Sequence, residues 1–213
     1  MTAVGRFTAL RPLGRTGFHA TALGLGDVAD RSLGLDACAD LLRRGFDAGV
    51  NVVDTAPAYE RGFSEEVVGE AIRGRRDGLF VIDKVDELDD PVAPQVDASV
   101  ARLGTEPDAF VFHSVSKPDA FRRLCHSGRF DELLDQRAKG RCRFIGISSH
   151  HPDALRDALE DGRCDLLMFP VGPFVDARYV EEILPTARAR GVATVTFKTF
   201  GAGMLVAATS GYG

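Results

Sequence analysis

The feature that most constrains the fold of this sequence is a repeated alternation of short apolar runs with longer amphipathic segments. The apolar runs have the length of β-strands and are nearly continuous, as in Phe80-Val81-Ile82, which is typical of strands buried on both faces. Each run is followed by a segment long enough for the crossover helix that a parallel neighbour requires. Seven strands are therefore expected, at residues 22–26, 50–54, 79–84, 108–113, 144–148, 166–170 and 192–198.

Amphipathic helices are expected between these strands. The first is indicated by apolar residues that recur on one helical face: Leu35, Cys38, Leu42 and Phe46. Ser64 is predicted to cap the next helix, and Pro91 to begin another. Two more are expected at 153–160 and 179–190, the last with a kink at Pro185.

Two folds combine parallel strands and helices in this way, a doubly wound sheet and a TIM barrel. Polar residues end four consecutive strands: Asp54, Lys84, His113 and Ser148. Chemistry at the carboxyl ends of consecutive strands is typical of the barrel. A doubly wound dinucleotide fold would carry G-x-G-x-x-G after its first strand, and residues 23–28 contain only the first half of that pattern. We therefore predict an α/β fold of the TIM-barrel type.

The domain prediction is a single barrel over residues 1–213, in which residues 1–20 form a hairpin that caps the bottom of the barrel. A closed barrel has eight strands, whereas seven are identified here. This count predicts either a barrel that lacks its C-terminal segment or an open barrel with an exposed edge strand.

Composition excludes several classes of protein. Apolar residues make up 45% of the 213 residues and charged residues 27%, which is ordinary globular usage and not that of a disordered chain. The net charge of −5 gives no electrostatic basis for a nucleic-acid or membrane partner. No apolar run is long enough to span a bilayer, and the N-terminus does not resemble a signal peptide. Four scattered cysteines indicate reduced thiols, so a cytoplasmic protein is expected.

Four polar residues are the candidates for chemistry. Asp54, Lys84 and His113 are expected at neighbouring strand ends, and Tyr59 follows Asp54 by five residues in the next loop. Each has a structural interpretation when taken alone, such as a cap or an ion pair. Their convergence on one mouth of the barrel favours a catalytic site.

Such a set is suited to protonating a carbonyl oxygen. The pKa of a tyrosine is near 10, and we expect the ammonium of Lys84 to lower the pKa of Tyr59, while Asp54 keeps Lys84 charged. His113 can hydrogen-bond the carbonyl oxygen and orient the substrate. Because the set holds no nucleophile, the electrons are expected from a cofactor, most simply as hydride from a nicotinamide.

The block FDAGVNVVDTAPAY at 46–59, followed by SEEVVG at 64–69, resembles the aldo-keto reductase family. The resemblance extends from residue 23 to residue 205. It implies an oxidoreductase that reduces an aldehyde or ketone on a TIM barrel, with NADPH as cofactor and NADH as the alternative. It also implies that Tyr59 is the general acid and that Lys84, Asp54 and His113 support it.

Cofactor contacts are implied by the same resemblance. Gly26, Asp27 and Val28 align with the loop near the nicotinamide, and Asp54 is implied as a further cofactor contact. Ser148 and Ser149 align with the pair that holds the carboxamide, although the family has Asn at the second position. Met168 stands where the family often has Gln, and Phe197 aligns with the aromatic residue that stacks on the ring, with a plain core role as the alternative. The loop that would wrap the pyrophosphate supplies Lys198, Thr199, Gly201, Gly203 and Leu205.

Two alternatives belong to other functional classes. The first is a non-catalytic relative that uses the barrel as a binding or regulatory module, suggested by the departures at Ser149 and Met168. The second is a metal-assisted hydrolase that uses His113, His150 and Asp54. We expect no metal, because metal-dependent barrels usually take ligands from the first strand as well, and that strand ends in Gly24-Leu25-Gly26. The expected partner is a small carbonyl substrate.

Overall fold

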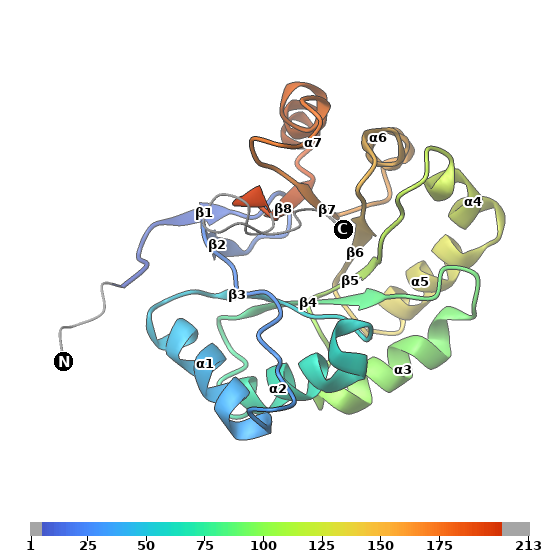
Figure 1. The fold of residues 1–213 in the computed structure, drawn as a ribbon. Coiled ribbons are helices and arrows are strands. Elements are labelled where there is room, and N and C mark those ends of the chain that lie inside the picture. Colours follow the sequence, from blue (N-terminus) through green and yellow to red (C-terminus); the bar gives the residue numbers. More distant parts are fainter. Residues whose placement is uncertain (1–5, 202–213) are drawn as a thin grey trace.

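The computed structural model of the protein describes residues 6–201 (Figure 1). Its centre is a parallel sheet of six strands that pair in their order along the chain. These strands are β3 (Val52–Asp54), β4 (Phe80–Val85), β5 (Ala109–Phe112), β6 (Phe144–Ser148), β7 (Leu166–Pro170) and β8 (Ala193–Phe197). This sequential parallel order is that of a TIM-barrel wall and confirms the predicted fold class.

Helices follow the strands and lie around the outer side of the sheet (Figure 1). The long ones are α1 (Leu35–Asp47), α2 (Phe63–Ile72), α3 (Val92–Leu103), α5 (Arg129–Ala138) and α6 (Pro152–Asp161). Shorter ones are α4 (Ala120–His126) and α7 (Leu184–Ala189), the latter preceded by the π-helical turn η2 (Tyr179–Ile183). The 3-10 turn η1 (Tyr59–Gly62) leads directly into α2. In residues 6–201, no helix is both long and apolar enough to cross a membrane.

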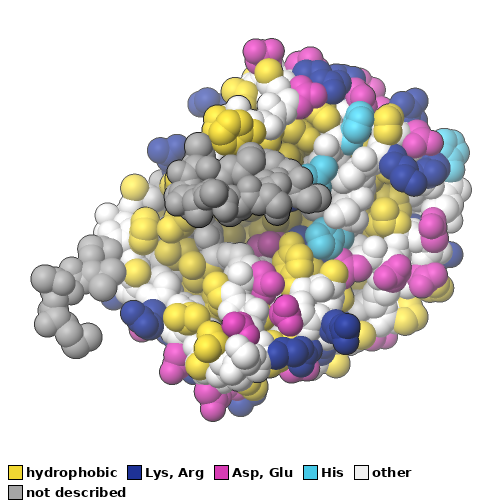
Figure 2. Space-filling model, in the orientation of Figure 1, with side chains coloured by type: hydrophobic (Ala, Val, Ile, Leu, Met, Phe, Trp, Pro, Cys, Tyr) yellow, Lys and Arg dark blue, Asp and Glu magenta, His cyan; other side chains and the backbone are white. Residues whose placement is uncertain are grey.

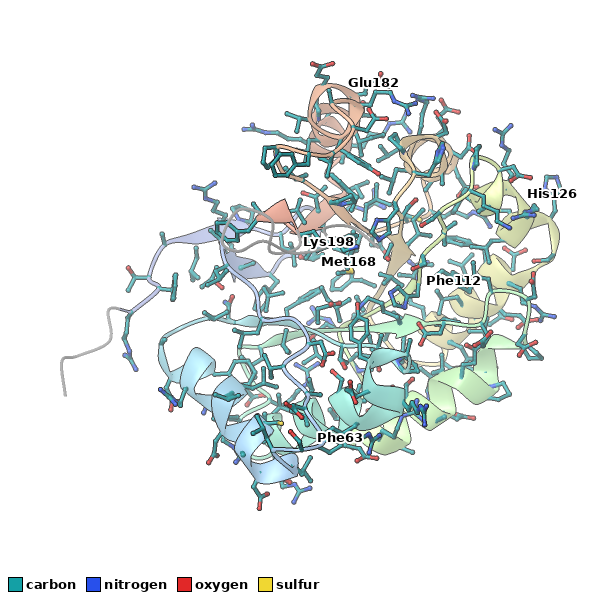
Figure 3. All side chains as sticks on the ribbon, in the orientation of Figure 1. Phe63, Phe112, His126, Met168, Glu182 and Lys198 are labelled. Carbon is teal, nitrogen blue, oxygen red and sulfur yellow. The ribbon has the colours of Figure 1, made fainter. Side chains whose placement is uncertain are left out.

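Both faces of the sheet are buried, as the continuous apolar runs predict. Along β4, Phe80 and Ile82 point into the barrel interior, whereas Val81 and Val85 pack against the outer helices. The same alternation sends Met168 inward and Phe112 outward (Figure 3). Because side chains alternate along a strand, Lys84 shares the inner face with Ile82, and Asp83 shares the outer face with Val81.

The first expected strand and one expected helix cap differ from the structure, which also contains two helices that were not expected. Residues 22–26 do not form a strand of the sheet; only Leu25 makes a single parallel bridge, to Val53. Ser64 is not a helix cap, because α2 begins one residue earlier and the Ser64 hydroxyl bonds to Thr55 instead. Helices α4 and α5, which lie in the long connection between β5 and β6, were not expected from the sequence.

A β-hairpin covers the amino ends of the strands. It consists of β1 (Leu10–Pro12) and β2 (His19–Thr21), paired antiparallel. The Arg15 amide donates to Gly191 O (2.6 Å) just before β8, and the Thr21 amide donates to the Asn51 side chain (2.8 Å) just before β3. The hairpin therefore covers the end of the sheet opposite the carboxyl ends. That residues 1–213 form one domain stays a prediction.

Candidate active site

Lys84 lies at the centre of the candidate site. It is the fifth residue of β4, it points inward, and only 2% of its side chain is exposed. Its ammonium donates to Asp54 Oδ1 (2.7 Å), to the carbonyl oxygen of Thr55 (2.8 Å) and to the Tyr59 hydroxyl (3.0 Å). An ammonium has three protons to donate, so all three have partners here. A buried lysine with this set of acceptors is held in one position.

Neighbouring elements bring these partners together. Asp54 is the last residue of β3, the strand beside β4, and Tyr59 begins η1 after a four-residue loop. The Lys84 ammonium also lies 4.4 Å from the centre of the Tyr59 ring, in addition to its bond to the hydroxyl. The structure thus brings together three of the four predicted catalytic residues in one hydrogen-bonded set.

Burial dominates the electrostatics of this set. It raises the pKa of Asp54, and the charge of Lys84 opposes that effect only in part. Burial lowers the pKa of Lys84, but Asp54 and Tyr59 outweigh it and raise this pKa overall, so Lys84 remains charged. Burial also raises the pKa of Tyr59 above its usual value, although Lys84 acts in the opposite direction. The sequence-based prediction of a lowered tyrosine pKa is therefore wrong for the protein alone, since it considered the charge of Lys84 but not burial.

His113 follows β5 and approaches Tyr59 from the next strand end. The two rings meet edge to face, with their centres 5.6 Å apart. The Nδ1 atom of His113 is hydrogen-bonded to Oδ1 of Asp86, and Oδ2 of Asp86 accepts the amide of Ala58. Asp86 was not predicted as a site residue. The only sequence signal is an acidic residue directly after β4, two positions beyond Lys84.

Backbone strain accompanies the candidate site. Residues 6–201 contain four non-glycine residues with positive φ: Glu60, Arg61, Ser114 and Lys198. Glu60 and Arg61 follow Tyr59, Ser114 follows His113, and Lys198 follows Phe197. Left-handed conformations at such residues cost free energy and gather at functional sites. Their placement supports the sequence-based choice of Tyr59, His113 and Phe197.

A cavity of about 330 Å³ adjoins Asp54 on the open side of the sheet, between β3 and β8. Five of the predicted cofactor-binding residues line it: Gly26, Asp54, Met168, Phe197 and Thr199. A Cβ on Gly26 would meet no atom of the described residues within 4 Å, so within this part of the chain the backbone is open to a ligand. The Phe197 ring also contacts His150, with the ring centres 5.1 Å apart. Figure 2 shows histidine and acidic side chains near the centre of the face in view.

Other predicted cofactor-binding residues have different surroundings. Ser149 is fully buried, and its hydroxyl donates to Val115 O (2.6 Å) and accepts the His151 amide, so it is not directed at the cavity. The Ser148 hydroxyl accepts the Ser114 amide (3.3 Å). Val28 packs against the core beneath α1 and α2, and Asp27 accepts the Ala29 amide (3.0 Å).

The loop after β8 was expected to wrap the pyrophosphate. Lys198 directly follows β8, with its ammonium 6.0 Å from the centre of the Phe197 ring. The Gly201 amide closes a turn onto Lys198 O (2.8 Å), with φ of +64° at this glycine. Gly203 and Leu205 lie outside the described residues.

Within residues 6–201 there is no cluster of three or more His, Cys, Asp or Glu side chains that could hold a metal ion. His150, which the hydrolase alternative requires, packs on Phe197. Burial, together with the charges of Lys198 and His113, lowers the pKa of His150. These contacts give no support to the metal-assisted alternative.

Comparisons with known proteins agree with this site. Residues 22–211 match the Aldo/keto reductase family. Pyridoxal 4-dehydrogenase from Microbacterium luteolum is 29% identical, over 94% of this chain and 73% of that protein. NADH-specific methylglyoxal reductase from Escherichia coli is 26% identical, over 91% of this chain and 65% of that protein. A solved aldo-keto reductase from Bacillus halodurans, in its holo form, superposes with a TM-score of 0.70 at 26% identity, over 88% of this chain and 65% of that one.

The fold and the matched relatives define the class of this protein as an oxidoreductase on a TIM-barrel scaffold. The chain belongs to the aldo/keto reductase family of NAD(P)H-dependent enzymes. This confirms the family predicted from the blocks at 46–59 and 64–69.

Proposed function

We propose that this protein reduces an aldehyde or ketone with NADPH or NADH, and that Tyr59 donates the proton to the carbonyl oxygen. The observation that carries the proposal is the hydrogen bond between the Lys84 ammonium and the Tyr59 hydroxyl, in a set that Asp54 completes. Family membership and this intact set favour an enzyme over the non-catalytic binding module.

The residues lining the cavity beside Asp54 fit a nicotinamide. Met168 and Phe197 give it apolar walls, and Thr199 adds a polar group. When bound there, the cofactor would supply a hydride to the carbonyl carbon. We propose Gly26, Asp54, Met168, Phe197 and Thr199 as its contacts within the described residues.

The protein's own residues would handle the proton. Tyr59 keeps its proton at neutral pH, because burial raises its pKa, so the phenol is the form present before the reaction. As the carbonyl oxygen takes this proton, negative charge develops on the phenolate oxygen, 3.0 Å from the Lys84 ammonium. Because the Lys84 ammonium is buried, its positive charge stabilises the phenolate more strongly than it would in water. His113, edge to face with Tyr59, would orient the carbonyl oxygen.

The substrate is proposed to be a small carbonyl compound. The names of the two curated relatives suggest methylglyoxal and pyridoxal as first probes. A cytoplasmic location is part of the same proposal, supported by four free cysteines: Cys38, Cys125, Cys142 and Cys164.

The test is a fluorescence titration of the purified chain with NADPH and with NADH, followed by turnover with both probes and with simple aldehydes. Saturable binding of one cofactor, together with carbonyl-dependent oxidation of it, is expected. Binding of neither cofactor, or turnover that is the same in Tyr59→Phe, would overturn the proposal.

A further inference from the structure

Asp86 connects two parts of the candidate site that are far apart in the sequence. It directly follows β4, and 13% of its side chain is exposed. One carboxylate oxygen pairs with Nδ1 of His113, after β5, and the other accepts the amide of Ala58, the residue before Tyr59. The side chain therefore ties the loop of the candidate proton donor to the histidine that faces it.

The chemistry of these bonds fixes the state of the imidazole. An ionised carboxylate can only accept hydrogen bonds, so Nδ1 of His113 must carry the proton that the two atoms share. The other ring nitrogen, Nε2, is then the one left for a substrate. It can donate to a carbonyl oxygen when it carries a proton as well.

We propose that Asp86 is a positioning residue of this site: its carboxylate keeps Nδ1 of His113 protonated, presents Nε2 to the carbonyl oxygen and holds the loop of Tyr59 against His113. The identity of the substrate in this statement rests on the proposed function. The protonation of Nδ1 does not, because it is a property of the free protein.

The first test therefore needs no turnover. Long-range proton–nitrogen NMR of the chain, with the His113 signal assigned by its loss in His113→Asn, reports which ring nitrogen carries a proton. We expect protonated Nδ1 in the wild type and a move of the proton to Nε2 in Asp86→Ala. An unprotonated Nδ1 in the wild type, or an unchanged ring in Asp86→Ala, would overturn the proposal.

Glu87→Ala is the matched control. Glu87 is the next residue and lines the same cavity of about 390 Å³ as Asp86 and Ala58. The hydrogen bonds of Glu87 to Gln95 and Asp90 use only its own backbone atoms, so truncation leaves them intact. The control is expected to keep Nδ1 of His113 protonated. Asp86→Asn, which preserves volume, provides a second variant should Asp86→Ala not fold.

The second test uses chemical rescue. Asp86→Ala should lower kcat/KM for carbonyl reduction by about 10- to 100-fold, which is less than the loss of a general acid, because Asp86 acts through His113. The adjoining cavity gives formate access to the vacated place, so formate should restore part of kcat/KM in Asp86→Ala and none in Glu87→Ala. A loss without rescue and without a change at Nδ1 would show a merely structural role and overturn the proposal. If the wild type reduces no carbonyl, the proposed function fails, while the NMR result still decides the role of Asp86.

Discussion

The ammonium of Lys84 lies 2.7 Å from the carboxylate of Asp54, and the two side chains come from the adjacent strands β4 and β3. Lys84 is nearly inaccessible to water, and 18% of the Asp54 side chain is exposed. Such a pair stabilises a fold only while both members are present, because either one alone is an uncompensated buried charge. The contact between Lys84 and Asp54 therefore affects both the stability of the fold and the chemistry at Tyr59, and mutations can separate these two effects.

Lys84→Met is expected to lower both stability and activity. It leaves Asp54 buried without its partner, at a cost of about 3 to 5 kcal/mol in the free energy of unfolding. It also removes the charge that lowers the pKa of Tyr59, so that pKa rises further and the phenolate formed on proton donation loses its stabilisation. Urea unfolding measures the first effect and kcat the second.

The double variant Lys84→Met/Asp54→Asn is the control for this prediction. Removing the remaining charge should restore much of the stability without restoring reduction. If the double variant is no more stable than Lys84→Met, the buried charge of Asp54 is not the cause of the loss.

Tyr59→Phe should abolish most carbonyl reduction and leave the fold intact. The change removes one hydroxyl, which accepts a hydrogen bond from the Lys84 ammonium. A general acid contributes about 10² to 10⁴ to the rate, so kcat should fall by that factor while the dissociation constant for the nicotinamide cofactor stays the same. Tyr179→Phe, on η2 and stacked on Phe169, is the matched control and should remain active. Equal turnover in the two variants would contradict the assignment of Tyr59.

The sequence predicted the parts of the site that depend on one strand or one loop. The bounds of β6 and β7 agree with the expected runs at 144–148 and 166–170, because buried parallel strands are marked by continuous apolar residues. The approach of Lys84 to Asp54 follows from their places at the ends of adjacent parallel strands. The role of Tyr59 as general acid was predicted from the resemblance of the block at 46–59 to the family.

What the sequence did not predict depends on burial and on contacts between distant loops. Asp86 contacts His113, 27 residues away, only because the ends of β4 and β5 lie side by side. The raised pKa of Tyr59 follows from burial, which the charge pattern alone does not contain. Ser149 aligned with a cofactor contact, but the path of its loop directs the hydroxyl to Val115.

Asp83→Asn should increase stability at alkaline pH. Asp83 is fully buried on the outer face of β4. Its Oδ1 accepts the Lys84 amide (2.8 Å), and its Oδ2 has no hydrogen-bond partner among residues 6–201. Burial, reinforced by the charge of Glu65, raises the pKa of Asp83 well above its usual value. The folded chain therefore keeps a proton that the unfolded chain releases near pH 4, so stability falls as pH rises toward the folded pKa.

Asparagine keeps the bond to the Lys84 amide and does not ionise, so it removes this pH dependence. Relative to the wild type, Asp83→Asn should gain roughly 1 to 3 kcal/mol in the free energy of unfolding at alkaline pH, where the wild type carries an unpaired buried charge. The gain should shrink at mildly acid pH. Asp90→Asn, at an exposed position, is the control and should change stability little at either pH. A gain that does not depend on pH would exclude ionisation of Asp83 as its cause.

Gly146→Ala should weaken the sheet that carries the site. Gly146 lies in the middle of β6 and pairs with Leu166 of β7, and a Cβ at this position would overlap the carbonyl oxygen of Leu166. Since the obstacle is backbone, it can be relieved only by separating the two strands, at a cost of roughly 3 kcal/mol in the free energy of unfolding. Gly26→Ala is the matched control, because its Cβ would enter space that is open within residues 6–201, so stability should be unchanged. The same open space is the proposed place of the nicotinamide, so Gly26→Ala should instead weaken cofactor binding.

Unfolding and cofactor titration of the two variants distinguish a glycine that the sheet needs, Gly146, from a glycine that the ligand needs, Gly26. A loss of stability in Gly26→Ala alone would contradict both assignments.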